Sequence, residues 1–235
     1  MTMSKIKRLA IIPARGGSKR IPDKNIKLFC GQPIISYILN VASESLLFDK
    51  IHVSTDSSQI REVIEQLGFS IDFMRPKELS DDFTPLMPVL KFVRETYSLL
   101  GNEFDEIWLL MACSPLIETD DLLNAAALFE KIDKSYSLLG VAEYPVPIDW
   151  AFQMNNTGVI KPIKPGFFSV RSQDMPKNYF DAGMLTVYSS LAIQFSEGAG
   201  SDTNFVGFVI PKHKAIDIDD EADWFLAEAL YNSKK

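Results

Sequence analysis

Short apolar runs alternate with amphipathic stretches through residues 1–144. Runs of about five to eight apolar residues are typical of buried strands, and apolar positions spaced three and four apart are typical of helices. Strands are predicted at residues 9–13, 50–55, 69–74, 106–112 and 135–142, and helices at about 33–47, 57–67, 85–100 and 119–132. This alternation predicts an α/β fold, a doubly wound and mostly parallel sheet with helices on both faces.

The pattern changes after Tyr144, where prolines fall among short β-like pieces and aromatic residues. We interpret 144–181 as an irregular insertion, a small β-arm, within one domain that spans residues 1–235. Further strands are predicted at residues 183–189, 205–211 and 215–219. A closing helix begins at Asp220, and its first turn is acidic, as the helix dipole favours.

The first apolar run leads into a loop that carries glycines and cations. Residues 9–25 read LAIIPARGGSKRIPDKN. In open α/β sheets ligands bind outside the carboxyl ends of the strands, and glycines there let backbone N–H groups approach an anion. The segment therefore predicts a polyphosphate-binding loop, although it matches neither the P-loop nor the G-x-G-x-x-G fingerprint. A solvent-exposed basic turn is the alternative.

A pair of aspartates near the end of the chain supplies the opposite charge. Asp217 and Asp219 alternate with isoleucines, and in a strand residues two apart share a face. Two adjacent carboxylates repel each other unless a cation lies between them, and Mg²⁺ takes one or two carboxylates with water and phosphate. The pair therefore predicts a Mg²⁺ site. The alternative is that Asp219 and Asp220 cap the last helix and that Asp217 is merely exposed.

Composition narrows the function classes. The net charge is −7, yet residues 1–27 hold eight Lys or Arg and one acid, which favours a small anionic ligand over a nucleic acid. The two cysteines, Cys30 and Cys113, and the two histidines, His52 and His213, lie far apart and match no zinc spacing. No apolar run reaches the roughly 18 residues of a membrane span or the length of a signal-peptide core. We expect a cytoplasmic protein.

A series of motifs in chain order resembles the CMP-sialic acid synthetase family of cytidylyltransferases, which activate nine-carbon 2-keto sugar acids with CTP. The motifs are PARGGSKRIPDKN, STDS, RPKELSDD, SPL, RSQDMP and AIDIDDEAD, within residues 6–229. The resemblance implies a Rossmann-like nucleotidyltransferase fold, Mg²⁺ as cofactor and a homodimer. It also implies transfer of CMP from CTP to the anomeric hydroxyl of a nonulosonic acid, with release of pyrophosphate.

The resemblance also assigns roles to residues of this chain. Arg15 and Lys24 are expected to neutralise the triphosphate during transfer, and Asp219 is expected to act with the metal. The nucleotide-binding set is Arg15, Gly16, Ser18, Lys24, Asn25, Arg75 and Asp82; the sugar-binding set is Arg171, Gln173, Tyr179 and Asp181; the metal ligands are Asp217 and Asp219.

Two departures from the sialic acid enzymes bear on the sugar. The sequence has Cys113 in Met-Ala-Cys-Ser-Pro-Leu where those enzymes have Gln-Pro-Thr-Ser-Pro-Leu, and it has Asp181-Ala182-Gly183 where they have Asn-Gly-Ala. The second favours the pseudaminic acid branch. Activation of sialic or legionaminic acid remains the alternative within the family, and a non-catalytic nucleotide-binding protein is the alternative from another class.

Overall fold

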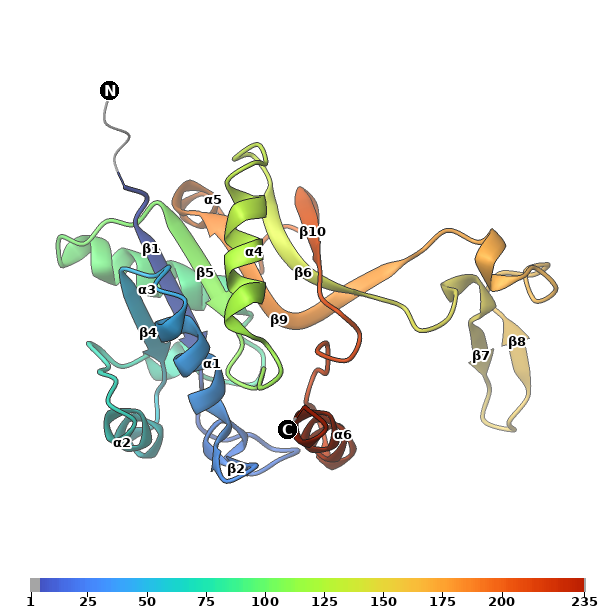
Figure 1. Ribbon diagram of the computed structural model, residues 1–235, viewed down its shortest axis with the longest axis horizontal. Helices are drawn as coiled ribbons and strands as arrows, with labels where there is room; N and C mark the ends of the chain where they lie inside the picture. Colours follow the sequence, from blue (N-terminus) through green and yellow to red (C-terminus); the bar gives the residue numbers. More distant parts are fainter. Residues whose placement is uncertain (1–4, 235) are drawn as a thin grey trace.

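The computed structural model describes residues 5–234, and within them a six-stranded sheet forms the centre of the molecule (Figure 1). The strand order is β10-β6-β9-β5-β1-β4. Strand β1 runs parallel to β4 and β5, and β10 runs parallel to β6. Strand β9 is antiparallel to both of its neighbours, β5 and β6. The predicted α/β fold with a mostly parallel sheet is confirmed.

The sheet strands and the helices have the following bounds. The strands are β1 Arg8–Pro13, β4 Lys50–Ser54, β5 Glu106–Leu110, β6 Ser137–Glu143, β9 Tyr179–Ser189 and β10 Phe205–Val209. The α-helices are α1 Ile34–Glu44, α2 Ser58–Gln66, α3 Leu86–Leu99, α4 Thr119–Phe129, α5 Ser190–Gln194 and α6 Glu221–Asn232. Short pieces complete the chain: β2 Leu28–Phe29, β3 Gln32–Pro33, β7 Phe152–Met154, β8 Ile160–Pro162, η1 Lys24–Ile26, η2 Lys77–Leu79, η3 Ile148–Trp150 and η4 Ser172–Asp174.

Both faces of β1 are buried, as its apolar run predicts. Ala10 and Ile12 pack in one core with residues of α1, α2 and α4, and Leu9 and Ile11 pack in a second core with residues of α3 and α5. Alternate side chains of a strand point to opposite faces, so helices cover the sheet on both sides. Helix α6 contributes to a third cluster beside the loop that follows β1. Among the described residues no helix has the length and apolar character needed to cross a membrane.

Two predicted strands are wrong. Residues 69–74, all of them described, form no strand; Ile71 instead fills the core, and Phe73 stacks on His52 with ring centroids 4.4 Å apart. Residues 215–219 likewise form no strand. Their chain leaves β10 through a turn in which the Ala215 N–H donates to the Pro211 carbonyl at 3.2 Å. In both places apolar residues pack inward without a neighbouring strand to complete a ladder.

Other boundaries move by a few residues. Helix α1 begins at Ile34, because Pro33 pairs with Leu28 in the β2–β3 ribbon. Ser57 caps α2 by accepting a hydrogen bond from the Ile60 N–H. Strand β9 begins at Tyr179, earlier than predicted.

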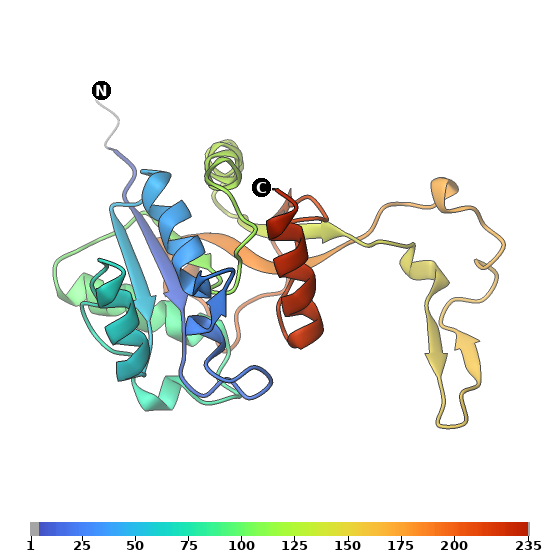
Figure 2. The ribbon, with the colours of Figure 1, turned by 60° about the horizontal axis from the view of Figure 1, so that its bottom comes forward.

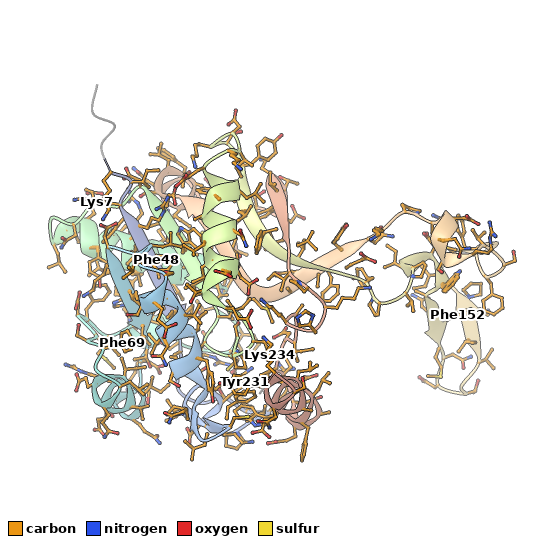
Figure 3. The ribbon with its side chains drawn as sticks, in the orientation of Figure 1. Lys7, Phe48, Phe69, Phe152, Tyr231 and Lys234 are labelled. Carbon is orange, nitrogen blue, oxygen red and sulfur yellow. The ribbon has the colours of Figure 1, made fainter. Side chains whose placement is uncertain are left out.

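The segment between β6 and β9 extends away from the sheet as an arm, clearest in Figures 1 and 2. It carries the antiparallel ribbon β7–β8. The Trp150 indole donates to the Phe167 carbonyl at 2.9 Å, and Phe152, labelled in Figure 3, packs edge-on against Phe168. These contacts lie within the arm itself.

Candidate active site

The loop after β1 lies at the carboxyl end of the parallel strands, where the sequence places it. The Gly16 N–H donates to the Asp56 carboxylate at 3.0 Å, which ties the loop to the residues after β4. Gly17 has a φ of +74°, a left-handed conformation that glycine adopts without strain. The Asn25 side chain donates to the Arg15 carbonyl at 3.0 Å. These contacts fold the loop back on itself, so that its cations line one cavity.

That cavity has a volume of about 460 Å³ and gathers most of the predicted nucleotide-binding residues. Its lining includes Arg15, Ser18, Lys24, Asn25, Arg75, Asp82 and Asp219. Gly16 contributes to the loop that forms the wall. The cavity therefore joins the start of the chain, the region after β4 and the segment before α6.

The cations that the loop after β1 contributes to this cavity are already ion-paired. Arg15 lies 2.7 Å from the Asp82 carboxylate, and Lys19 pairs with the same carboxylate. The hydrogen bonds from Lys19 and then Arg15 lower the pKa of Asp82 below its ordinary value. Arg20 pairs with Asp219 at 2.8 Å. An anionic ligand that enters must replace these carboxylates as the partner of the cations.

Arg75 is 5% exposed and forms part of the cavity wall. Its Nε donates to the Ser54 hydroxyl at 3.1 Å, and its backbone N–H donates to the Thr55 carbonyl at 2.7 Å. Burial lowers the pKa of Arg75 to about 10. These bonds fix Arg75 to the end of β4, so that its side chain forms a rigid part of the wall.

The acidic segment meets the cationic loop directly. The Lys24 ammonium donates to the Ile218 carbonyl at 2.6 Å and lies 3.7 Å from the Asp219 carboxylate. Ile218 is 1% exposed and packs with Ile21 and Trp224. The two oppositely charged regions are thus parts of one site.

Asp217 lies next to Asp219 and against β9. Burial of its carboxylate is the main cause that raises the pKa of Asp217, and the negative charge of Asp219 is the second. The positive charge of Lys24 opposes the shift. Gly183 of β9 has a φ of +63°, and a Cβ at this position would lie 3.1 Å from the Asp217 carboxyl carbon. A glycine is therefore needed here both for the backbone conformation and for the close approach of Asp217.

The donor set at Asp217 and Asp219 suits a hard divalent cation. The negative charge of Asp219 helps to raise the pKa of Asp217, and a positive charge shared by the two carboxylates would offset this repulsion. Within residues 5–234 no cluster of three or more His, Cys, Asp or Glu is placed to hold a metal. Mg²⁺ fits this arrangement, because it takes one or two protein carboxylates and completes its shell with water and substrate oxygen.

The predicted sugar-binding residues divide between the sheet and the arm. Asp181 of β9 lines a second cavity of about 350 Å³, which shares Leu86 with the first. Tyr179 lies at the start of β9, opposite Glu143. Arg171 and Gln173 lie in the arm, and neither lines either of these two cavities. Arg171 pairs with Asp174 at 2.8 Å.

A family model described as cytidylyltransferase matches residues 9–144 of the chain. This chain belongs to the cytidylyltransferase family. The matched region runs from β1 through β6 and includes the whole cationic loop. The cavity lined by that loop is therefore the candidate active site of a cytidylyltransferase.

Two relatives, each named for the nonulosonic acid that it activates, align over nearly the full length of this cytidylyltransferase. It is 36% identical to the pseudaminic acid cytidylyltransferase of Campylobacter jejuni subsp. jejuni serotype O:2, over 96% of this chain and 97% of that protein. It is 29% identical to the CMP-N,N'-diacetyllegionaminic acid synthase of Legionella pneumophila, over 94% of this chain and 95% of that protein.

A solved structure shares the fold. CMP:2-keto-3-deoxy-manno-octonic acid synthetase, in complex with CTP, superposes with a TM-score of 0.71 at 17% sequence identity, covering 97% of this chain and 100% of that chain. Similarity at this level of identity concerns the fold.

Two residues of the cytidylyltransferase site, Lys19 and Arg20, were given no role from the sequence. Both line the cavity; the charge of the loop was counted, but only Arg15 and Lys24 among its cations were given a role. Cys113 lies beside Asn25, with its Sγ 3.5 Å from the Asn25 Oδ1. Burial raises the pKa of the Cys113 thiol to about 12, so this thiol is a neutral neighbour of the site and not a nucleophile.

Proposed function

We propose that this cytidylyltransferase transfers CMP from CTP to the anomeric hydroxyl of a nonulosonic acid, giving a CMP-sugar and pyrophosphate. Pseudaminic acid is the favoured acceptor, because the relative at 36% identity is a pseudaminic acid cytidylyltransferase and aligns over 96% of this chain. The observation that carries the proposal is the joining of Lys24 and Asp219 in one cavity. Legionaminic or sialic acid is the alternative acceptor, which the Legionella relative supports.

In this proposal the cationic loop holds the triphosphate. Arg15, Lys19 and Lys24 face the cavity, and Ser18 and the backbone N–H groups of the loop add hydrogen bonds to phosphate oxygens. The anomeric hydroxyl loses its proton to water, its oxygen attacks the α-phosphorus, and the bond from the α-phosphorus to the pyrophosphate oxygen breaks. Positive charges fixed in advance stabilise the charge that moves onto the leaving group. Asp82 gives up its ion pairs with Arg15 and Lys19 when the phosphates enter.

The base and the metal complete the nucleotide end. Asn25 and Arg75 line the same cavity as the phosphate-binding cations and are proposed to contact the cytidine. Asp217 and Asp219 are proposed as the Mg²⁺ ligands. When bound there, Mg²⁺ would polarise the α-phosphate and lower the pKa of the attacking hydroxyl. Asp219 also holds Arg20, so binding of a metal releases a further cation for the phosphates.

The sugar is proposed to occupy the second cavity, beside Asp181. This cavity combines polar groups from Asp181, Thr186 and Ser201 with apolar side chains such as Leu109. A sugar acid that carries hydroxyl, acylamino and methyl groups needs both kinds of lining. Arg171 is proposed to pair with its carboxylate, together with Gln173 and Tyr179, after the arm moves or a second chain supplies it.

The arm also supports a homodimer. Its exposed apolar side chains include Ile148, Phe152, Met154, Ile160, Ile163 and Phe168. Apolar surface concentrated on an extended segment marks a protein interaction site, and we propose a second copy of this chain as the partner.

We place the enzyme in the cytoplasm. Residues 1–235 act as one cytidylyltransferase domain with the arm inserted.

The test is pyrophosphate release from CTP with a panel of nonulosonic acids, with Mg²⁺ and with EDTA. We expect turnover with pseudaminic acid and Mg²⁺ that exceeds turnover with legionaminic or sialic acid, and no turnover in EDTA. A higher rate with either of the other two acids would reassign the acceptor. Binding of CTP without pyrophosphate release for any acid would instead indicate a non-catalytic nucleotide-binding protein.

A further inference from the structure

The segment that carries Asp217 and Asp219 lies outside the sheet, so something other than a strand ladder must hold it. Residues 211–214 form a turn, in which the Lys214 N–H donates to the Pro211 carbonyl at 2.8 Å. Beyond the aspartates, Asp220 caps α6 through the N–H groups of Ala222 and Asp223. Asp217 therefore lies on a short link between this turn and a capped helix.

Lys214 anchors the first end of that link. Its side chain is only 11% exposed. Its ammonium lies 2.7 Å from the Asp121 carboxylate and 2.6 Å from the Glu118 carboxylate, both at the start of α4. Asp121 is also buried, at 8% exposed. A buried ion pair of this kind is geometrically demanding, because each charge must have its partner in place.

The same network reaches α6. Glu118 also pairs with Lys234 at 2.6 Å, a residue that follows α6 and is labelled in Figure 3. The hydrogen bonds from Lys214 and then Lys234 lower the pKa of Glu118 to about 2. The start of α4 thus holds the chain on both sides of the aspartates, once before them and once after α6.

The cap of α4 does not require the lysine. Asp121 accepts the Glu118 N–H at 2.9 Å in the capping box. Acids in the first turn also match the helix dipole without a counter-ion, whereas a lysine at this end opposes it. The buried lysine is therefore not explained by the needs of α4, and its position three residues before Asp217 supplies another explanation.

We propose that Lys214 is a positioning residue, which fixes the Asp217 and Asp219 carboxylates for the divalent cation by tethering their segment to α4. The inference rests on the proposed function, since it takes these aspartates as the metal ligands. Lys214 sets one end of the link, Lys24 and Ile218 set the other, and Gly183 limits how far Asp217 can move toward β9.

The test compares Lys214→Met with the wild type by two readouts. Calorimetry gives the affinity for CTP with Mn²⁺ and with EDTA, and kinetics gives the Mg²⁺ concentration for half-maximal activity. We expect Lys214→Met to reduce the ratio of the two CTP affinities at least fivefold and to raise the half-activating Mg²⁺ concentration at least tenfold. The affinity in EDTA should stay within twofold, because the loop after β1 is untouched.

Three further variants separate positioning from stability. Asp121→Asn removes the other charge of the same ion pair and should also reduce the ratio of the CTP affinity with Mn²⁺ to that with EDTA. Lys214→Arg keeps the positive charge and should keep this ratio close to the wild-type value. Lys50→Met is the matched control, because it removes a lysine 2.6 Å from Asp72 without touching the acidic segment. It should leave the ratio unchanged.

Two results overturn the inference, and they are distinguishable. If Lys214→Met and Asp121→Asn lower the melting temperature but leave the affinity ratio at the wild-type value, Lys214 has only a structural role. If the wild type itself binds CTP equally well with Mn²⁺ and with EDTA, the metal assignment in the proposed function fails, and this inference fails with it.

Discussion

The two ends of the proposed active site are built in different ways. The nucleotide end is assembled within one body from the loop after β1 and the segment before α6, which meet at Lys24 and Asp219. The proposed sugar end is divided, since Asp181 lines a cavity that shares Leu86 with the cavity of the cationic loop, while Arg171 and Gln173 lie on the arm. If the proposed function holds, this fold prepares the nucleotide site in advance, and the arm completes the sugar site.

The largest expected effect is at the acidic end of the nucleotide site. Asp219→Ala should bring turnover below detection while the protein stays folded, because it removes a proposed metal ligand. Asp220→Ala is the matched control. Its carboxylate caps α6, so it should lower the melting temperature and retain turnover. Pyrophosphate release and circular dichroism measure both; normal turnover by Asp219→Ala would refute the metal assignment.

The next effect is at the cationic end. Arg15→Ala should lower kcat/KM about 100-fold, which corresponds to about 2.7 kcal/mol of transition-state stabilisation, the size expected for one preorganised donor. Arg61→Ala removes an arginine whose partner is Glu65, one turn along α2, and should leave the rate unchanged. Initial rates at saturating sugar and varied CTP concentration give kcat/KM for both variants and for the wild type. A rate for Arg15→Ala within twofold of wild type would contradict the role of this arginine.

A smaller effect is expected at the arm. Arg171→Ala should raise the KM for the sugar acid about tenfold, the loss of a charge-assisted hydrogen bond, and leave the dissociation constant for CTP unchanged. Lys161→Ala changes an exposed residue of β8 and should alter neither constant. Steady-state kinetics and CTP calorimetry separate the two substrates. An equal loss in CTP binding would mean that the two ends are not built separately.

The smallest effect concerns the ion pairs that Asp82 makes with Arg15 and Lys19. Asp82→Asn should tighten CTP binding in EDTA by up to about fivefold, since the phosphates would no longer displace the ion pairs of Asp82 with Arg15 and Lys19, and exposed ion pairs are weak. Asp81→Asn, whose carboxylate instead accepts N–H groups of its own loop, serves as the control. Weaker CTP binding by Asp82→Asn would show that Asp82 contacts the nucleotide favourably.

The sequence predicts the parts of this site that depend on local pattern. The apolar run before Pro13 and the glycines after it suffice to place a buried strand and its ligand-binding loop. The alternation in residues 215–219 predicted a strand wrongly, because it reports which side chains point inward and not whether a neighbouring strand exists. The bond from Lys214 to Asp121 spans 93 residues of chain, and no local pattern indicates such a contact.

The sugar residues show the same limit from the other side. Motif order assigns Arg171 and Gln173 to the sugar, but the direction in which the arm extends depends on packing between distant segments. The sequence analysis named Gly183 only as the third residue of the Asp-Ala-Gly motif. Its positive φ and its contact with Asp217 appear only once β9 and the acidic segment are folded together.

The central claim is that the loop after β1 and the segment before α6 form one nucleotide–metal site. A crystal structure of the protein with CTP and Mn²⁺, with anomalous scattering to locate the metal, tests it most directly. The account predicts triphosphate oxygens against Arg15 and Lys24 and a manganese peak between the phosphates and the carboxylates of Asp217 and Asp219. A nucleotide bound elsewhere, or a manganese ion that touches neither aspartate, would contradict it.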